Sequence, residues 1–132
     1  MANAALANLQ AEGTAAYRRQ QSGPMRPASD DHVVLRLEGF LDISRYPEFR
    51  SLFEKAPRAP ILVDLRDVEG VDSIFLSELL LFRRRHAPLL VATLIRPGGE
   101  VAHIFALAEM GKRVDIFDDH DAALKALAAQ TG

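Results

Sequence analysis

The chain has 132 residues, which favours one domain that can bury a hydrophobic core without disulfides or metal. Its 16 basic and 18 acidic residues leave a net charge of -2, so no excess of positive charge points to nucleic acid or an anionic membrane. Cysteine is absent, which excludes disulfides, thiolate nucleophiles and cysteine-based metal sites.

Residues 1–31 differ in composition from the rest of the chain. They are rich in Ala, Gln, Ser, Gly and Pro, and "QQSGPMRPASDD" contains the Gly and Pro residues that are typical of a linker. We therefore predict an N-terminal extension over residues 1–31, either flexible or a weak helix interrupted by Gly13, and one domain over residues 32–132. No apolar run reaches the ~20 residues of a membrane span and no secretory signal is visible, so we expect a cytoplasmic protein without direct membrane insertion.

From His32 onward, segments with strand and helix patterns alternate. "HVVLRLEG" and "FLDI" predict two short strands around Gly39, and "SRYPEFRSLFEKA" predicts a helix with Ser44 as its N-cap. "PILVDLRDV" and "PLLVATLI" predict buried strands. Between them, Asp72-Ser73 opens a helix that "RRRH" closes with cations, which complement the helix dipole.

The remaining segments continue the alternation. "PGGEVAHIFALAEMG" predicts a helix that ends at Gly111, "VDIFD" a short strand, and "DHDAALKALAAQ" a terminal helix with Asp119 or Asp121 near its start. Together these elements predict an α/β fold, in which about four helices pack on a mixed, mainly parallel central sheet.

No set of residues indicates catalysis or metal binding. His32, His86, His103 and His120 show no metal-ligand spacing, and no nucleophile stands beside a base. The turn at Gly98-Gly99 lacks the pattern of a phosphate-binding loop or a dinucleotide fingerprint. We therefore expect no catalytic residue, no metal and no cofactor.

Four short motifs stand in the order and spacing of a known family: Gly39-x-Leu41-Asp42, Asp64-Leu65-x-x-Val68, Asp72-Ser73 with Leu76 and Leu79, and Met110-Gly111 followed by "VDIFDD". Residues 33–127 thereby resemble the STAS family, the domain shared by sulfate transporters and anti-sigma factor antagonists. The resemblance implies a small α/β domain that does no chemistry and binds partners near Asp42 and Asp72. Many members are phosphorylated by a serine kinase that doubles as an anti-sigma factor, and phosphorylation breaks the complex.

The sequence departs from this family at the start of the signature helix. The family usually reads Asp-Ser-Ser-Gly-Leu-Gly, whereas this chain reads Asp-Ser-Ile-Phe-Leu-Ser from Asp72 onward. Ile74 therefore stands where the family carries its phospho-acceptor serine. Ser73 remains as a candidate acceptor, although helix capping is the favoured use of Asp72 and Ser73.

A helical wheel places Leu76, Leu79 and Leu80 on the core side of this helix. Four apolar residues then fall on or beside the polar face of the helix: Ile74, Phe75, Leu81 and Phe82. Either the helix is covered there, for example by the N-terminal arm, or these residues form an apolar partner patch, which we favour because the family docks partners on this face. The predicted partner-binding residues are Asp42, Ser44, Asp72, Ser73, Ile74, Phe75, Glu78, Leu81 and Phe82.

Three functions remain open at this point. The first is an anti-sigma factor antagonist-like module that binds a serine kinase-type anti-sigma factor without the usual phosphorylation switch. The second is a structural subunit, such as the STAS partner of an ABC-type lipid transporter or a scaffold of a sensory complex. The third is a nucleotide- or small-ligand-binding domain that uses the loops near Asp42, Asp72 and Gly98-Gly99. The sequence leaves the oligomeric state open, a homodimer included.

Overall fold

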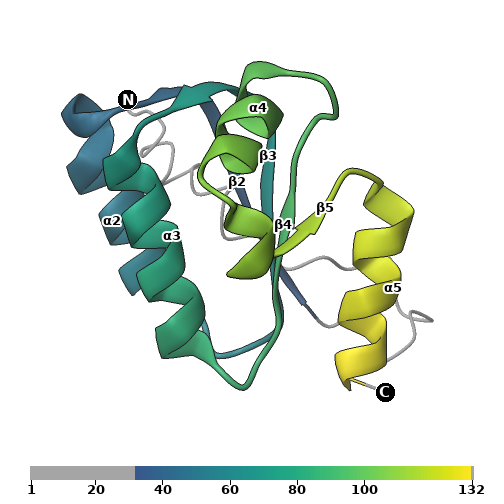
Figure 1. The fold of residues 1–132 in the computed structure, drawn as a ribbon. Coiled ribbons are helices and arrows are strands. Elements are labelled where there is room, and N and C mark those ends of the chain that lie inside the picture. Colours follow the sequence, from purple (N-terminus) through teal and green to yellow (C-terminus); the bar gives the residue numbers. More distant parts are fainter. Residues whose placement is uncertain (1–31, 132) are drawn as a thin grey trace.

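The computed structural model describes residues 32–131, and the predicted extension over residues 1–31 lies outside this range. Four strands form one sheet in the order β2 (Val33–Leu41), β3 (Ile61–Val71), β4 (Val91–Leu94) and β5 (Asp115–Phe117). All three strand pairings are parallel (Figure 1). The sheet predicted as mixed and mainly parallel is thus parallel throughout the described part.

Four α-helices follow the strands in turn, which confirms the predicted α/β fold: α2 (Tyr46–Glu54), α3 (Ser73–His86), α4 (Glu100–Leu107) and α5 (His120–Thr131). Two short 3-10 turns accompany them, η2 (Ile43–Arg45) before α2 and η3 (Met110–Lys112) after α4. None of the helices in residues 32–131 is long and apolar enough to cross a membrane.

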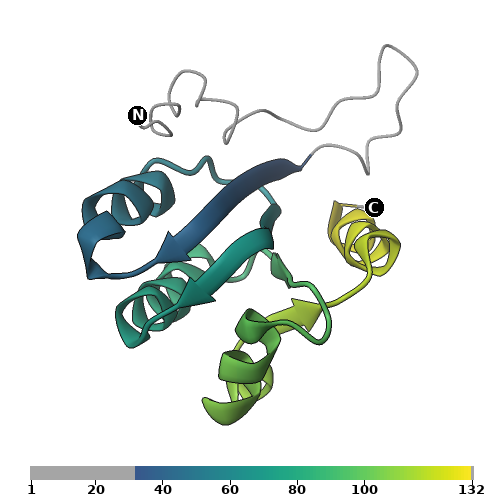
Figure 2. The ribbon, with the colours of Figure 1, turned by 90° about the horizontal axis from the view of Figure 1, so that it is seen from above.

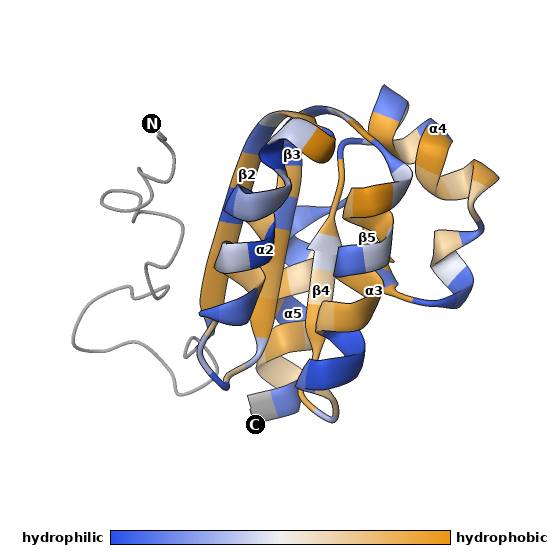
Figure 3. Ribbon diagram, turned by 90° about the vertical axis from the view of Figure 1, so that its left-hand side faces the viewer, coloured by the Kyte–Doolittle hydropathy of each residue, from blue (hydrophilic) through white to orange (hydrophobic). Residues whose placement is uncertain are grey.

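The strand order explains how the helices are distributed. Because neighbouring strands follow each other along the chain, right-handed crossovers place α2, α3 and α4 on one face of the sheet. Their buried side chains form one core with that face, and α5 packs on the other face through Ala123 and Leu127. Figure 2 shows α2 and α3 on one side of the sheet and α5 on the other. Figure 3 shows the hydrophobic residues that run along β3 and β4 between these layers.

Three boundaries differ from the prediction. The segments around Gly39 form one continuous strand, β2, because a bulge accommodates the glycine at φ +77°. Asp42, not Ser44, caps the first helical turn. Helix α4 ends at Leu107 rather than Gly111, and the chain turns at Glu109 in a left-handed conformation with φ 54°.

Strand β3 contains two additional residues relative to β2. Arg36 lies opposite Asp64, but Glu38 lies opposite Asp67, and a second register shift follows Gly39. Such bulges bend a strand and increase its local twist. They lie just before the carboxyl ends of β2 and β3, where the predicted partner-binding residues begin.

Candidate functional site

The carboxyl ends of β2 and β3 bring Asp42 and Asp72 together. Leu41 and Val71, the last residues of the two strands, are partners in the sheet register. The N–H of Asp72 donates to the carbonyl oxygen of Leu41 at 3.2 Å. Each aspartate therefore starts a helical turn at the same edge of the sheet, as parallel pairing requires.

Asp72 is the N-cap of α3. Its Oδ1 accepts hydrogen bonds from the backbone N–H groups of Ile74 and Phe75, at 3.0 and 3.1 Å. These are two of the four N–H groups that the first turn of a helix leaves without an intrahelical acceptor. The predicted capping role of Asp72 is confirmed, and Ser73 follows as an exposed first residue of the helix.

Asp42 holds the adjacent turn in the same way. Its Oδ1 accepts from the backbone N–H of Ser44 at 3.0 Å and from the Ser44 hydroxyl. The hydroxyl hydrogen bond is the main reason why the pKa of Asp42 lies below its ordinary value. Asp42 is thus an ionised carboxylate at neutral pH, next to the start of α3.

Arg45 connects this turn to strand β2. Its guanidinium donates to the carbonyl oxygen of Glu38 at 2.6 Å and forms a two-pronged ion pair with Glu48 at 2.9 Å. The hydrogen bonds to Glu48 raise the pKa of Arg45. A Cβ at Gly39 would lie 2.9 Å from Arg45 Nη1, so a side chain there would displace the guanidinium as well as strain the backbone.

The structure contradicts the prediction that Phe75 and Phe82 belong to a surface patch. Phe75 is fully buried and Phe82 is 2% exposed. Phe82 stacks on Phe53 of α2 at 4.6 Å, and Phe75 meets Phe49 edge to face at 5.2 Å. Burial of such rings contributes about 1.5–3 kcal/mol each, so they hold α2 and α3 together instead of binding a partner.

The helical wheel placed the core side of α3 wrongly because apolar residues flank its buried stripe on both sides. Its buried side chains recur at Phe75, Leu79, Phe82 and His86, a stripe that faces both the sheet and α2. His86 was predicted as one of the cations of the last turn, but it is buried in this stripe. Its Nε2 lies 2.6 Å from the carbonyl oxygen of Ala59.

The other predicted partner residues of α3 lie at its surface. Ile74 and Glu78 are half-buried, and Leu81 is 40% exposed. Ile74 also contacts the core, and Glu78 accepts from the hydroxyl of Tyr46 at 3.4 Å. Ile74 and Leu81 are seven residues apart, so they lie on the same side of α3, two turns from each other.

Two exposed apolar residues at this edge were not predicted. Ile43 is 61% exposed in the turn that Asp42 caps, and Phe40 is 54% exposed at the end of β2. The Phe40 ring lies over Gly70, where a Cβ would be only 2.6 Å from it. The sequence carried a signal, since strand alternation directs Phe40 away from the buried Leu41. We call Phe40, Asp42, Ile43, Ser44, Asp72, Ser73 and Ile74 the carboxyl-edge surface.

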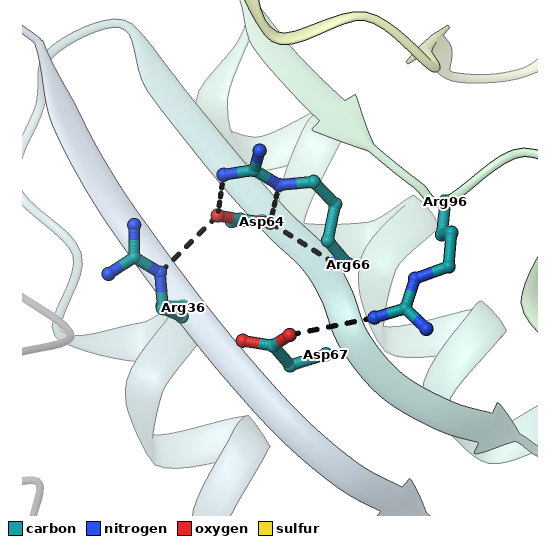
Figure 4. Close-up of polar contacts among 5 residues, drawn as sticks. All are labelled: Arg36, Asp64, Arg66, Asp67 and Arg96. Carbon is teal, nitrogen blue, oxygen red and sulfur yellow. Dashed lines mark hydrogen bonds and ion pairs between the residues drawn. The ribbon is translucent and has the colours of Figure 1, made fainter.

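A separate charged cluster supports this edge from within the sheet. Asp64 is 3% exposed, and its carboxylate accepts from the Arg66 side chain at 2.9 and 3.0 Å and from Arg36 at 3.3 Å (Figure 4). It also accepts from the backbone N–H of Arg66, next to the first bulge. Burial alone would raise the pKa of Asp64, but the hydrogen bonds and charges of the two arginines outweigh it and lower the pKa below 3.8.

Comparison with protein families assigns the chain to a known domain family. A family model described as "Mlab, STAS domain" matches residues 25–117, more than half of the chain. The chain belongs to the STAS domain family. Comparison with curated proteins gives no match.

Two solved structures of one protein share the fold of this STAS domain. The crystal structure of protein TM1081 of Thermotoga maritima, described as an anti-sigma factor antagonist, is 21% identical, with a TM-score of 0.63 over 73% of this chain and 86% of that one. Its NMR structure is 20% identical, with a TM-score of 0.60 over 81% of this chain and 93% of the other. At this identity the likeness shows the fold alone.

The STAS motifs now have physical explanations in this chain. Gly39 lies at the second register shift, next to Arg45; Asp64 pairs with two arginines beside the first; and Asp72 caps α3. All three serve the geometry of the carboxyl edge. Residues 32–131 contain no group of three or more side chains that could hold a metal ion.

Proposed function

We propose that this STAS domain is a non-catalytic module that binds a protein partner through its carboxyl-edge surface. The observation that carries the proposal is the pairing of two exposed aspartate-capped turns with two exposed apolar side chains, Ile43 and Phe40. Interfaces commonly combine an apolar centre with a polar rim, and the exposed Ser44 and Ser73, with the half-buried Asp42 and Asp72, supply that rim. Ile74, Glu78 and Leu81 extend the surface along α3.

The partner class that we propose is a serine kinase-type anti-sigma factor, in line with the anti-sigma factor antagonist-like fold. A phosphate on residue 74 would add about -1.5 to -2 charges within the apolar contact, and the cost of burying them would weaken docking. Ile74 has no hydroxyl group, so this switch is absent at that atom. Docking then persists whether or not the partner holds ATP.

An affinity pull-down from the native host tests the proposal. Wild-type protein is expected to retain a defined partner, and Ile74→Asp to lose most of it, because the carboxylate would be driven into an apolar contact. Leu107→Asp is the matched control, since Leu107 is 69% exposed on α4, away from the carboxyl edge. Equal capture by wild type and Ile74→Asp would contradict the proposal.

A phosphorylation assay then tests the partner class. With the captured kinase and ATP, the wild type is expected to take up no phosphate, whereas Ile74→Ser restores an acceptor at the family's usual position. Incorporation at Ser73 of the wild type would disprove the absence of a switch. Failure of the kinase to modify Ile74→Ser would argue against a kinase-type partner.

The missing acceptor at position 74 also fits a second function, a permanent structural subunit of a transporter or sensory complex. Such a subunit needs the same docking surface and no switch. Capture of a transporter or receptor subunit in a fixed 1:1 ratio, with no kinase, would favour it. A nucleotide-binding role of the carboxyl edge is tested by NMR titration with ATP and GTP, for which we expect no perturbation of the Ser73 and Ile74 amides.

A further inference from the structure

The opposite end of the molecule carries a depression of about 750 Å³, at the amino-terminal edge of the sheet. It lies between the last turns of α3 and α5 and the starts of β4 and β5, and we call it the amino-edge depression. Helix α3 runs from the carboxyl edge to this edge over 14 residues, about 20 Å. The depression is therefore separate from the partner surface proposed above.

The lining of the depression is positively charged. Arg83, Arg84, Arg113 and Asp115 line it, which gives the wall a net formal charge of +2. Arg83 and Asp115 pair at 3.6 Å, so the acid is already neutralised. Arg84 and Arg113 are exposed and form no ion pair with an acid among residues 32–131.

Apolar side chains also line the depression, and hydrogen bonds hold one of its sides. Leu80, Leu90 and Pro88 contribute aliphatic surface next to the arginines. The side-chain amide of Gln130 on α5 accepts from the N–H of Leu90 and donates to the carbonyl oxygen of Pro88 at 3.4 Å. These contacts hold the loop before β4 against α5, so the concavity is built into the fold.

We propose that the amino-edge depression binds a small organic phosphate that carries an apolar group. Two guanidinium groups without an acidic partner among residues 32–131 suit the oxygens of a phosphate, and the apolar side chains in the same lining would contact an organic group attached to it. A volume of about 750 Å³ falls within the range of small-molecule sites, about 300–1,000 Å³. The inference goes beyond the partner-binding function and does not depend on it.

Titration of the full chain with phenyl phosphate tests this site, with inorganic phosphate and benzyl alcohol as the two half-probes. Phenyl phosphate is expected to bind saturably and more tightly than either half-probe. In NMR spectra the perturbed amides should be those of residues 89–91 and 130, and not those of Ser73 and Ile74. Absence of saturable binding, or perturbation centred on the start of α3, would overturn the proposal.

Two arginine variants separate the site from general charge. Arg84→Ala with Arg113→Ala should weaken phenyl phosphate binding at least tenfold, because each removes a charge-assisted hydrogen bond. Arg85→Ala is the matched control, because it removes the same charge from the same turn of α3 but does not line the depression. An equal loss in Arg85→Ala would mean that the anion is attracted by the basic helix end alone, and the assigned site would be wrong.

Discussion

Asp64 is a carboxylate buried in the middle of a parallel strand, a place where a charge is costly unless it is paired. Arg66 and Arg36 supply that pairing from outside, with side chains that are 40% and 51% exposed. Because Asp64 also accepts the N–H of Arg66 beside a bulge, it fixes the shape of β3 and not only its charge.

Replacement of Asp64 by Asn tests this role. Asn keeps an acceptor for the Arg66 N–H but loses the charge, so we expect a decrease of about 1–3 kcal/mol in the free energy of unfolding at pH 7. The folded-state pKa is below the ordinary 3.8, so this stabilisation is present above 3.8 and disappears as the pH falls through the folded-state value. Urea unfolding at a series of pH values should therefore show the full difference between wild type and variant at pH 7, and this difference should shrink as the pH is lowered below 3.8.

Asp67→Asn is the control for that experiment. Asp67 is 64% exposed and lies 3.7 Å from Arg96, in the same region of β3 (Figure 4). A surface pair of this kind contributes about 0–1 kcal/mol. If the two variants cost the same, Asp64 stabilises the strand no more than a surface charge does.

At the scale of elements, α3 is fixed at its start by a single side chain. Asp72→Ala removes the acceptor of two N–H groups and is expected to cost about 0.5–2 kcal/mol of stability, whereas Asp72→Asn should cost less. Hydrogen exchange of the Ile74 and Phe75 amides should accelerate in Asp72→Ala. Ser73→Ala is the control, because Ser73 caps nothing in the described structure. An unchanged exchange rate at Ile74 would show that the cap is not what holds this turn.

The other end of α3 is sensitive to pH. His86 is buried against Phe82, and burial, assisted by the charge of Arg58, lowers its pKa below the ordinary 6.5, although the Ala59 carbonyl oxygen opposes this. The unfolded chain therefore binds a proton at His86 more readily than the folded chain. Stability should be constant above pH 6.5 and fall as the pH drops from 6.5 through the folded-state pKa.

Unfolding experiments between pH 7.5 and pH 5 measure this effect. His86→Gln keeps an N–H donor for Ala59 but cannot titrate, so its stability should change less over this range than that of the wild type. His103→Gln on the exposed face of α4 should behave as the wild type does. If the free energy of unfolding depends on pH equally in wild type and His86→Gln, His86 is not the cause of the pH dependence.

The elements also show what the sequence could and could not predict. The order of strands and helices, the cap at Asp72 and a mainly parallel sheet followed from hydrophobic patterning and turn residues, whereas the expected mixed character of the sheet did not hold in the described part. The burial of Phe75 and Phe82 did not follow, because partly buried apolar residues flank the buried stripe of α3 on both sides, and the sequence alone does not show which side faces the core. The prediction divided β2 at Gly39, because a glycine within a strand usually marks a turn. Its place at a register shift with β3 becomes visible only when both strands are paired.

At the scale of the whole molecule, the two ends of the sheet have different chemistry. The carboxyl edge presents Asp42 and Asp72 with exposed apolar side chains, and the amino edge presents Arg84 and Arg113 around a concavity. A net charge of -2 conceals this separation. The two ends lie about 20 Å apart along α3, far enough for substitutions at one end to have little effect at the other.

Ile43 offers the sharpest test of the carboxyl-edge surface as a whole. It is 61% exposed and makes no part of the core, so Ile43→Asp should leave the melting temperature almost unchanged. A carboxylate in the centre of an apolar contact would be desolvated without a partner, so we expect the affinity for the captured protein to fall at least tenfold. Leu107→Asp adds the same charge at a comparably exposed position on α4 and should leave the affinity unchanged. If both variants weaken binding equally, added negative charge alone explains the effect, and if neither does, the partner docks elsewhere.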